Sequence, residues 1–285
     1  MSTTTSLPAR VGVLGGGRMG AGIAHAFLIN GCEVLVVERD DDAAAAARER
    51  VESAVAKSVE RGLPGTAADF ASRLAVSTDY ADFADRELVV EAVPEIWELK
   101  VSSLRGVEKH LAEDAVLASN TSSLSMTGLA AELARPQNFI GLHFFNPVPA
   151  STLIEVVIAQ QSRPELVTTA KGWVEALGKT AVVVNDAPGF ASSRLGVAIA
   201  LEAMRMVEEG VASAEDIDAA MVLGYQHPTG PLRTTDIVGL DVRLGIAEYL
   251  AETLGERFAP PQILRDKVAR GELGRKTGKG FFDWA

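Results

Sequence analysis

The chain has 285 residues, of which 47% are hydrophobic and 23% are charged, and this composition excludes a largely disordered, collagen-like or coiled-coil protein. Its net charge of −11 excludes the strongly basic surface with which proteins bind nucleic acids or anionic membranes. The single cysteine, Cys32, excludes an intrachain disulfide and an all-cysteine metal site. No run approaches the ~18 apolar residues of a membrane-spanning helix. Because no secretory signal is visible, we expect a cytoplasmic protein.

The first two thirds of the sequence alternate short apolar runs with longer helical patterns. Near-continuous apolar strands between helices favour a mainly parallel sheet covered on both faces, although the last two strands could equally extend the sheet in an antiparallel direction. The predicted strands are 11–14, 34–37, 88–93, 115–118, 140–144, 154–158 and 181–184, and the predicted helices are 20–30, 43–60, 96–111 and 165–177.

The pattern changes after Pro188 and Gly189, beyond which the sequence has helical periodicity and no convincing strand. The length favours about two domains, so we expect an α/β domain over residues 1–186 and an all-α domain over residues 187–285. The helices predicted for the second domain are 190–209, 217–223, 241–254 and a last one from Pro260 to near Gly271.

Gly15, Gly17 and Gly20 form a G-x-G-x-x-G pattern between an apolar strand and a helix. Such glycines permit a tight turn and the close approach of a pyrophosphate, which the N–H groups at the helix N-terminus then bind. Glu38 ends the next strand, where its carboxylate can accept hydrogen bonds from ribose hydroxyls and would repel a 2′-phosphate. The pattern therefore predicts a Rossmann-type domain and favours NAD over NADP, with Arg39 interpreted as a surface charge.

His143 is the candidate acid–base group, because it ends an apolar strand and open α/β sheets place ligands at the carboxyl ends of their strands. Glu155 lies within the apolar run 153–157, and a buried carboxylate needs a partner. A pair of the two residues would fix the imidazole tautomer and stabilise its protonated form. The alternative is that Glu155 faces solvent on an edge strand. No tyrosine has a lysine four residues later, which excludes the short-chain dehydrogenases.

Taken together, these motifs resemble the 3-hydroxyacyl-CoA dehydrogenase family over essentially the whole chain. The resemblance implies an NAD-binding Rossmann-type domain over residues 1–186. It also implies that residues 187–285 form a helical domain that mediates dimerisation and takes part in substrate binding. The protein is therefore expected to be a homodimer. The blocks that carry the resemblance are 12–24 (GVLGGGRMGAGIA), 89–95 (VVEAVPE), 118–124 (ASNTSSL), 143–149 (HFFNPVP), 186–190 (DAPGF), 230–241 (GPLRTTDIVGLD) and 276–284 (KTGKGFFDW).

The same resemblance implies reversible, NAD-dependent oxidation of an L-3-hydroxyacyl-CoA, of short chain such as 3-hydroxybutyryl-CoA, to the 3-oxoacyl-CoA. His143 would be the general base supported by Glu155, Ser122 would lie near the nicotinamide and the thioester, and Asn146 would shape the same pocket. No metal is implied. The residues that match cofactor-binding positions are Gly15, Gly17, Arg18, Met19, Gly20, Glu38, Glu95, Lys100, Ser122 and Lys276, although Lys100 and Lys276 alone would be interpreted as surface charges.

Two positions depart from the family pattern. Ser193 stands where the family often has an asparagine that hydrogen-bonds toward the substrate, and Ala54, beside Ser53, stands where it has a serine that contacts coenzyme A. Arg61 lies near the position of a coenzyme A-binding lysine, so Ser122, Ser193 and Arg61 are the candidate substrate-binding residues. These departures leave open a dehydrogenase of the same family that acts on a carrier-protein thioester, a free 3-hydroxy acid or a carnitine-like compound. A non-catalytic, crystallin-like NAD-binding protein is the second alternative, against which the retention of both His143 and Glu155 argues.

Overall fold

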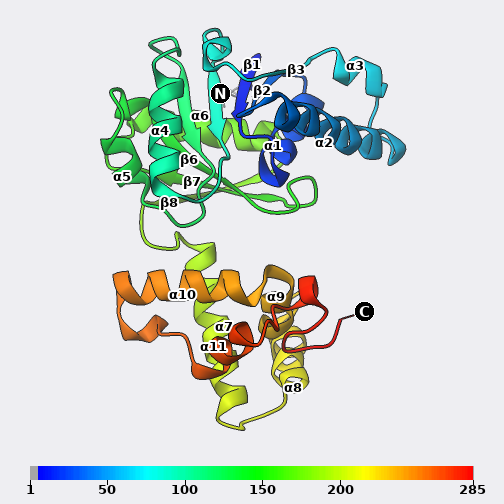
Figure 1. Cartoon of the computed structure of the whole chain (residues 1–285), viewed down its shortest axis with the longest axis vertical. Coiled ribbons are helices and arrows are strands. Elements are labelled where there is room, and N and C mark those ends of the chain that lie inside the picture. The colour runs from blue at the N-terminus through cyan, green and yellow to red at the C-terminus, as the bar shows by residue number, and fades with distance from the viewer. Residues whose placement is uncertain (1–5, 285) are drawn as a thin grey trace, which may run out of the picture. The chain divides into compact units, whose positions relative to one another are not determined.

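The computed structural model describes residues 6–284, and the chain divides into two compact units, Met1–Asp186 and Ala187–Ala285 (Figure 1). The first unit has an α/β architecture and the second consists of helices, which confirms the predicted fold class. Within the described residues, no helix is long and apolar enough to span a lipid bilayer.

The first unit is built on an eight-stranded sheet with the strand order β3-β2-β1-β4-β5-β6-β7-β8. All neighbouring strands are parallel except β6 and β7, which are antiparallel, while β8 is parallel to β7. The sequence left open whether the last two strands extend the sheet in an antiparallel direction, and the structure shows a single reversal, between β6 and β7. The strands are β1 (Arg10–Leu14), β2 (Glu33–Val37), β3 (Leu74–Ser77), β4 (Leu88–Glu91), β5 (Val116–Ser119), β6 (Phe139–Phe144), β7 (Leu153–Ile158) and β8 (Thr180–Asn185).

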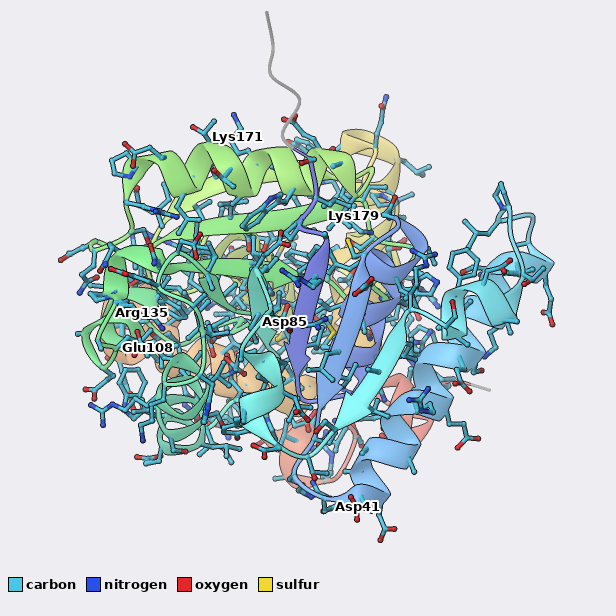
Figure 2. All side chains as sticks on the ribbon, turned by 90° about the horizontal axis from the view of Figure 1, so that it is seen from above. Asp41, Asp85, Glu108, Arg135, Lys171 and Lys179 are labelled. Carbon is cyan, nitrogen blue, oxygen red and sulfur yellow. The ribbon has the colours of Figure 1, made fainter. Side chains whose placement is uncertain are left out.

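Helices cover both faces of this sheet. Apolar residues of α1, α2 and α6 share one hydrophobic core with the strands, whereas α4 and α5 contact β4, β6 and β7. Figure 2 shows α6, marked by Lys171, and the end of α4, marked by Glu108, on opposite sides of the sheet. The helices of this unit are α1 (Arg18–Ile29), α2 (Asp41–Glu60), α3 (Ala67–Ala71), α4 (Trp97–Glu108), α5 (Met126–Ala131) and α6 (Pro164–Ala176).

Three short elements of the first unit, β3, α3 and α5, were not predicted from the sequence. Strand β3 has four residues, of which only Leu74 is fully buried, so it lacks the continuous apolar run of the central strands. Helices α3 and α5 are too short for a periodic pattern to emerge, and they begin at the side-chain caps Thr66 and Ser125.

The second unit packs its helices around a core of Val197, Leu201, Met204, Leu240 and Leu250. Its C-terminal segment is held by the buried carboxylate of Asp236, which accepts hydrogen bonds from the backbone N–H groups of residues 281 and 282 and from the indole N–H of residue 284. The helices are α7 (Ser192–Glu208), α8 (Ala214–Ala219), α9 (Pro231–Val238), α10 (Leu240–Leu254) and α11 (Gln262–Ala269).

Two details of this unit differ from the prediction. Helix α9 was missed, because its sequence PLRTTDIV contains few apolar residues, although Pro231 at its first position is a typical helix start. The helix predicted over 217–223 begins earlier, at Ala214 after the N-cap Ser213, and continues as a π-helical turn over Ala220–Gly224.

Candidate active site

The turn between β1 and α1 has the geometry of a phosphate-binding loop. Gly15 has a φ of +89°, and a side chain at Gly20 would collide with the carbonyl oxygen of Gly15, so both positions require glycine. At Gly17, in contrast, an added Cβ would meet no atom within 4 Å. The turn is therefore closed toward the protein and open at the N-terminus of α1, which fits the approach of a dinucleotide pyrophosphate.

The carboxylate of Glu38 lies directly beside this turn. Its Oε1 accepts a hydrogen bond of 2.7 Å from the backbone N–H of Gly16, and its Oε2 accepts one of 3.1 Å from the N–H of Arg39. The Arg39 guanidinium turns instead to Asp40, at 2.9 Å, and its side chain is 83% exposed. The Glu38 carboxylate is thus held against the glycine turn just after β2, and Arg39 is a surface charge.

Strands β6 and β7 bring His143 and Glu155 together. The two residues are directly opposite each other in the antiparallel ladder, so their side chains lie on the same face of the sheet. The Nδ1 of His143 lies 2.8 Å from the Oε2 of Glu155, and the two residues are 6% and 1% exposed. The ring of Phe145 packs against the imidazole, with 4.4 Å between the two ring centroids. The alternative that Glu155 faces solvent is therefore wrong.

Glu95 organises the segment that follows β5. Its Oε1 accepts hydrogen bonds from the hydroxyl of Thr121 (2.5 Å) and from the backbone N–H groups of Ser122 (2.9 Å) and Ser123 (3.1 Å). Its Oε2 lies 3.2 Å from the ammonium of Lys100. Burial acts to raise the pKa of the Glu95 carboxyl, but Lys100 and these hydrogen bonds outweigh it and hold the pKa below its usual value. Glu95 is therefore anionic at neutral pH.

Lys100 is a buried residue and not the surface charge that its sequence context suggests. Its side chain is 1% exposed, and its Nζ lies 2.6 Å from Oε1 of Glu91 and 3.2 Å from the carbonyl oxygen of Val93. Glu91 is fully buried at the end of β4, and its other oxygen accepts a hydrogen bond of 2.6 Å from Ser119 on β5. The ion pair therefore links the ends of two neighbouring strands to the segment that carries Ser122.

A cavity of about 340 Å³ gathers these elements at the carboxyl ends of the strands. It brings together six of the residues that the sequence singled out, and it adds Asn120, whose side chain accepts a hydrogen bond of 2.8 Å from the backbone N–H of Phe144. The predicted residues among its lining are Met19, Glu95, Lys100, Ser122, His143 and Asn146.

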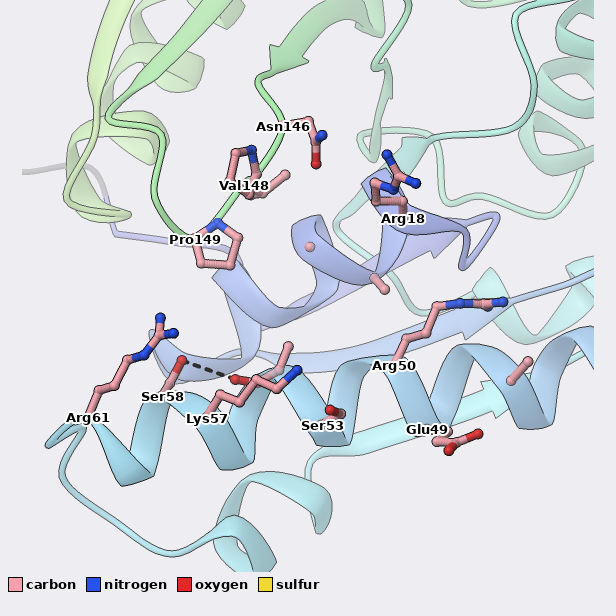
Figure 3. Close-up of a pocket in the computed structure, with 15 residues that line it drawn as sticks. Arg18, Glu49, Arg50, Ser53, Lys57, Ser58, Arg61, Asn146, Val148 and Pro149 are labelled. Atoms are coloured by element: carbon pink, nitrogen blue, oxygen red, sulfur yellow. Dashed lines mark hydrogen bonds between the residues drawn. The ribbon is translucent and has the colours of Figure 1, made fainter. Parts of the chain in front are cut away.

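A larger cavity, of about 640 Å³, lies between α1, α2 and the loop after β6 (Figure 3). Four basic side chains line it, Arg18 from α1 and Arg50, Lys57 and Arg61 along or just after α2, with Glu49 as the single acidic one within the described residues. Figure 3 shows residues 146–149 across from α2. Against the net charge of −11, this is a locally basic site suited to an anionic ligand.

Two of the predicted residues belong to the second unit. Lys276 forms an ion pair with Asp241, at 2.6 Å, and its side chain is 46% exposed. Ser193 is in the first turn of α7 and is partly buried.

Sequence reasoning missed Glu91, Asn120, Arg50 and Lys57. Glu91 carried a usable signal, because it is a carboxylate at the end of an apolar strand, the same argument that singled out Glu155. Asn120 lies inside the block 118–124 but has no pattern of its own. Arg50 and Lys57 look like ordinary exposed charges of a long helix, and only the fold places them beside one cavity.

Residues 6–284 contain no group of three or more histidine, cysteine, aspartate or glutamate side chains that could hold a metal ion. Cys32 is buried, and burial raises the pKa of its thiol to about 11, which keeps it protonated.

These features together define the class of NAD-dependent dehydrogenases. They are a Rossmann-like sheet, a glycine turn with an acidic residue after β2, and a buried histidine–carboxylate pair at the same edge of the sheet. Comparison with family models is more specific: the 3-hydroxyacyl-CoA dehydrogenase NAD binding domain matches residues 10–187, and the C-terminal domain of the same family matches residues 189–284. The chain belongs to the 3-hydroxyacyl-CoA dehydrogenase family, and it is an oxidoreductase with NAD as its cofactor.

Individual relatives support this assignment over the full length of the chain. A 3-hydroxybutyryl-CoA dehydrogenase of Mycobacterium tuberculosis is 40% identical over 284 residues, covering 96% of this chain and 98% of the relative. The mitochondrial hydroxyacyl-coenzyme A dehydrogenase of Rattus norvegicus is 38% identical, covering 96% and 90%. The crystal structure of an (S)-3-hydroxybutyryl-CoA dehydrogenase from Ralstonia eutropha has a TM-score of 0.93 at 37% identity, covering 98% and 100%. The family and the cofactor expected from the sequence are thus confirmed.

Proposed function

We propose that this protein catalyses the reversible, NAD-dependent oxidation of a short-chain L-3-hydroxyacyl-CoA, with 3-hydroxybutyryl-CoA as the expected substrate. The observation that carries the proposal is the pairing of His143 with Glu155 at 2.8 Å, on the wall of a cavity that Ser122 and Glu95 also line. Relatives with the same full-length match are named for this substrate.

In this proposal His143 is the general base. Glu155 accepts the hydrogen bond from Nδ1–H, which leaves Nε2 as the nitrogen that takes the proton of the substrate 3-hydroxyl. Bound NAD would supply the acceptor for the hydride that leaves C3 as the hydroxyl becomes a carbonyl. The imidazolium that forms is stabilised by the carboxylate of Glu155, and in the reverse direction it returns its proton to the substrate oxygen. Ser122 and Asn146 position the substrate in the same cavity.

We assign the cofactor to the glycine turn and the groups around it. The backbone of residues 15–20 would receive the pyrophosphate, with Arg18 and Met19 in the same turn, and Glu38 would bind the ribose hydroxyls. Glu95 and Lys100 would face the nicotinamide side of the cavity. Lys276 is included on the family likeness alone.

The basic cavity beside α2 is the proposed site for the phosphates of coenzyme A. Arg50 and Lys57 on α2 and Arg61 just after it offer three cationic side chains to this cavity, so the loss of a serine at Ala54 need not remove the site. Ser193 is proposed to hydrogen-bond the substrate in place of an asparagine.

The test of this function is to follow the loss of NADH absorbance after the purified protein is mixed with NADH and acetoacetyl-CoA. Rapid loss supports the proposal. Acetoacetyl groups on an acyl carrier protein and free acetoacetate are run beside it, and a preference for either over the coenzyme A thioester would overturn the substrate assignment. Tight NADH binding without turnover of any of the three would overturn the catalytic assignment.

Glu38 is expected to select NADH over NADPH. Glu38→Gln keeps an oxygen for the Gly16 N–H but removes the charge that repels a 2′-phosphate, so the ratio of kcat/KM with NADPH to that with NADH should rise about tenfold. Arg39→Gln is the matched control, since its guanidinium faces Asp40, and it should change the ratio less than about twofold. An unchanged ratio in Glu38→Gln would contradict this role.

We also propose that the chain is a homodimer formed through residues 187–285, with residues 1–186 as the NAD-binding domain. Large exposed apolar side chains are concentrated in the second unit, where Leu195, Leu223 and Tyr225 are 63%, 81% and 75% exposed. The acyl-CoA substrate and this second copy are the expected partners, and the cytoplasmic location stays a prediction.

Sedimentation tests the dimer. The protein should sediment at twice the 30.1 kDa chain mass, and Leu223→Asp should shift it toward the monomer by placing a charge in an apolar interface. Val183→Asp, the same kind of change on an exposed apolar residue of β8 in the first unit, should leave it dimeric. A monomeric wild-type protein would refute the proposal.

A further inference from the structure

A charged cluster made of Glu91, Lys100 and Glu95 lies at the wall of the 340 Å³ cavity, with Glu91 behind the two lining residues. The single ammonium of Lys100 lies 2.6 Å from the first carboxylate and 3.2 Å from the second. Glu91 and Lys100 are 0% and 1% exposed, so water screens this pair little, whereas the side chain of Glu95 is 35% exposed and reaches the cavity. Two carboxylates share one cation, and the cluster therefore keeps one net negative charge.

Within the described residues, Glu95 and Lys100 are the only aspartate, glutamate, lysine or arginine side chains that line this cavity. The one further titratable group of the lining is His143, which has its own carboxylate partner in Glu155. The cluster is therefore the source of fixed negative charge in the wall formed by β4, β5 and α4, and the His143–Glu155 pair lies on the neighbouring strands β6 and β7. Because Glu91 and Lys100 are buried, water screens their charges less than it would screen charges at the surface.

The nicotinamide ring is positively charged in NAD⁺ and neutral in NADH. We propose that the Glu91–Lys100–Glu95 cluster biases the cofactor site toward NAD⁺, and that Glu91 is the positioning residue that sets this bias. The inference rests on the proposed function in one respect, namely that the nicotinamide occupies this cavity. Hydride transfer from C3 of the substrate removes the ring's charge, so the same cluster shifts the equilibrium on the protein toward the oxidised cofactor.

Glu91 is the informative residue because it acts only through its neighbours. It is fully buried and does not line the cavity, so its replacement changes the charge without removing a group that touches the cofactor. Glu95, in contrast, also holds the backbone of Ser122 and Ser123. In Glu91→Gln the amide oxygen can still accept from Lys100 and from the N–H of residue 93, and the amide nitrogen can donate to the hydroxyl of residue 119.

The experiment measures two dissociation constants with the purified full-length protein. NADH is titrated by its fluorescence, and NAD⁺ is titrated by displacement of NADH. In Glu91→Gln the cluster becomes neutral, and the ratio of Kd for NAD⁺ to Kd for NADH should rise about fivefold, mostly through weaker binding of NAD⁺. Ser119→Ala is the matched control, because it removes a hydrogen bond from the same carboxylate without changing any charge, and its ratio should stay within about twofold of wild type.

A double variant keeps the test decisive if Glu91→Gln does not fold. Glu91→Gln combined with Lys100→Met removes the buried ion pair as a unit, which proteins tolerate better than the loss of one partner, and leaves the charge of Glu95. Both dissociation constants can shift in the double variant, because Lys100 lines the cavity, but the cluster keeps its net negative charge and the ratio should lie within about twofold of wild type. A fivefold rise of the ratio in the double variant would overturn the proposal. The proposal would also be overturned if Glu91→Gln changed the Kd for NAD⁺ and the Kd for NADH by the same factor. A wild-type protein that binds neither form of the cofactor would instead refute the proposed function.

Discussion

Replacement of His143 by glutamine is expected to lower kcat about 10³-fold, because the amide cannot take the proton of the substrate hydroxyl. Glutamine is close to histidine in size and can still donate a hydrogen bond to Glu155, so the buried carboxylate keeps a partner and the fold is preserved. The Kd of NADH should change less than about threefold, since the phosphate and ribose contacts lie on β1, α1 and β2. Steady-state rates with acetoacetyl-CoA and fluorescence titration with NADH separate these two effects.

His110→Gln is the control for this experiment, because His110 is an exposed histidine just after α4 and should be silent. A His143→Gln enzyme with kcat within tenfold of wild type would refute the assignment of the base.

Two glycines of the β1–α1 turn should respond oppositely to the same added methyl group. In Gly17→Ala the backbone, with a φ of −62°, accepts the new side chain and no protein atom lies within 4 Å, so the melting temperature should be nearly unchanged. The methyl group occupies the space into which we expect the pyrophosphate to bind, and the Kd of NADH should rise at least about tenfold, the effect of losing ~1.4 kcal/mol of binding.

Gly20→Ala should instead destabilise the protein. Its methyl group would collide with the carbonyl oxygen of Gly15, which cannot move without displacing the start of α1, and such overpacking costs about 1–3 kcal/mol. Thermal melts and NADH titrations on the two variants distinguish a binding defect from a folding defect. Normal NADH affinity in Gly17→Ala would mean that the cofactor phosphates lie elsewhere.

The sequence was most informative where a local pattern determines the structure. The apolar strands and the glycine turn of the first unit follow from short-range rules, and so does the acidic residue Glu38 at the end of β2. His143 and Glu155 were paired by the argument that a carboxylate in an apolar run needs a partner.

What the sequence did not give depends on contacts between distant segments. Lys100 has the sequence environment of an exposed helix residue. Its burial depends on the carboxylates of Glu91 and Glu95, which the turn after β4 brings next to its ammonium group. The basic cavity beside α2 likewise needs the loop of residues 146–149 as its opposite wall. The direction of β7 was undetermined, because an apolar run carries no information on whether its neighbour is parallel.

The single reversal of direction between β6 and β7 has a consequence for how this enzyme can be altered. His143 and Glu155 face each other because of the register of that ladder, and a slip of one residue would turn Glu155 to the opposite side of the sheet. The hairpin loop 145–152 can therefore vary in sequence, and even in length, provided that the ladder beyond it keeps its alignment. A deletion within β7 itself, although it removes no catalytic side chain, would separate base from carboxylate as completely as a substitution does.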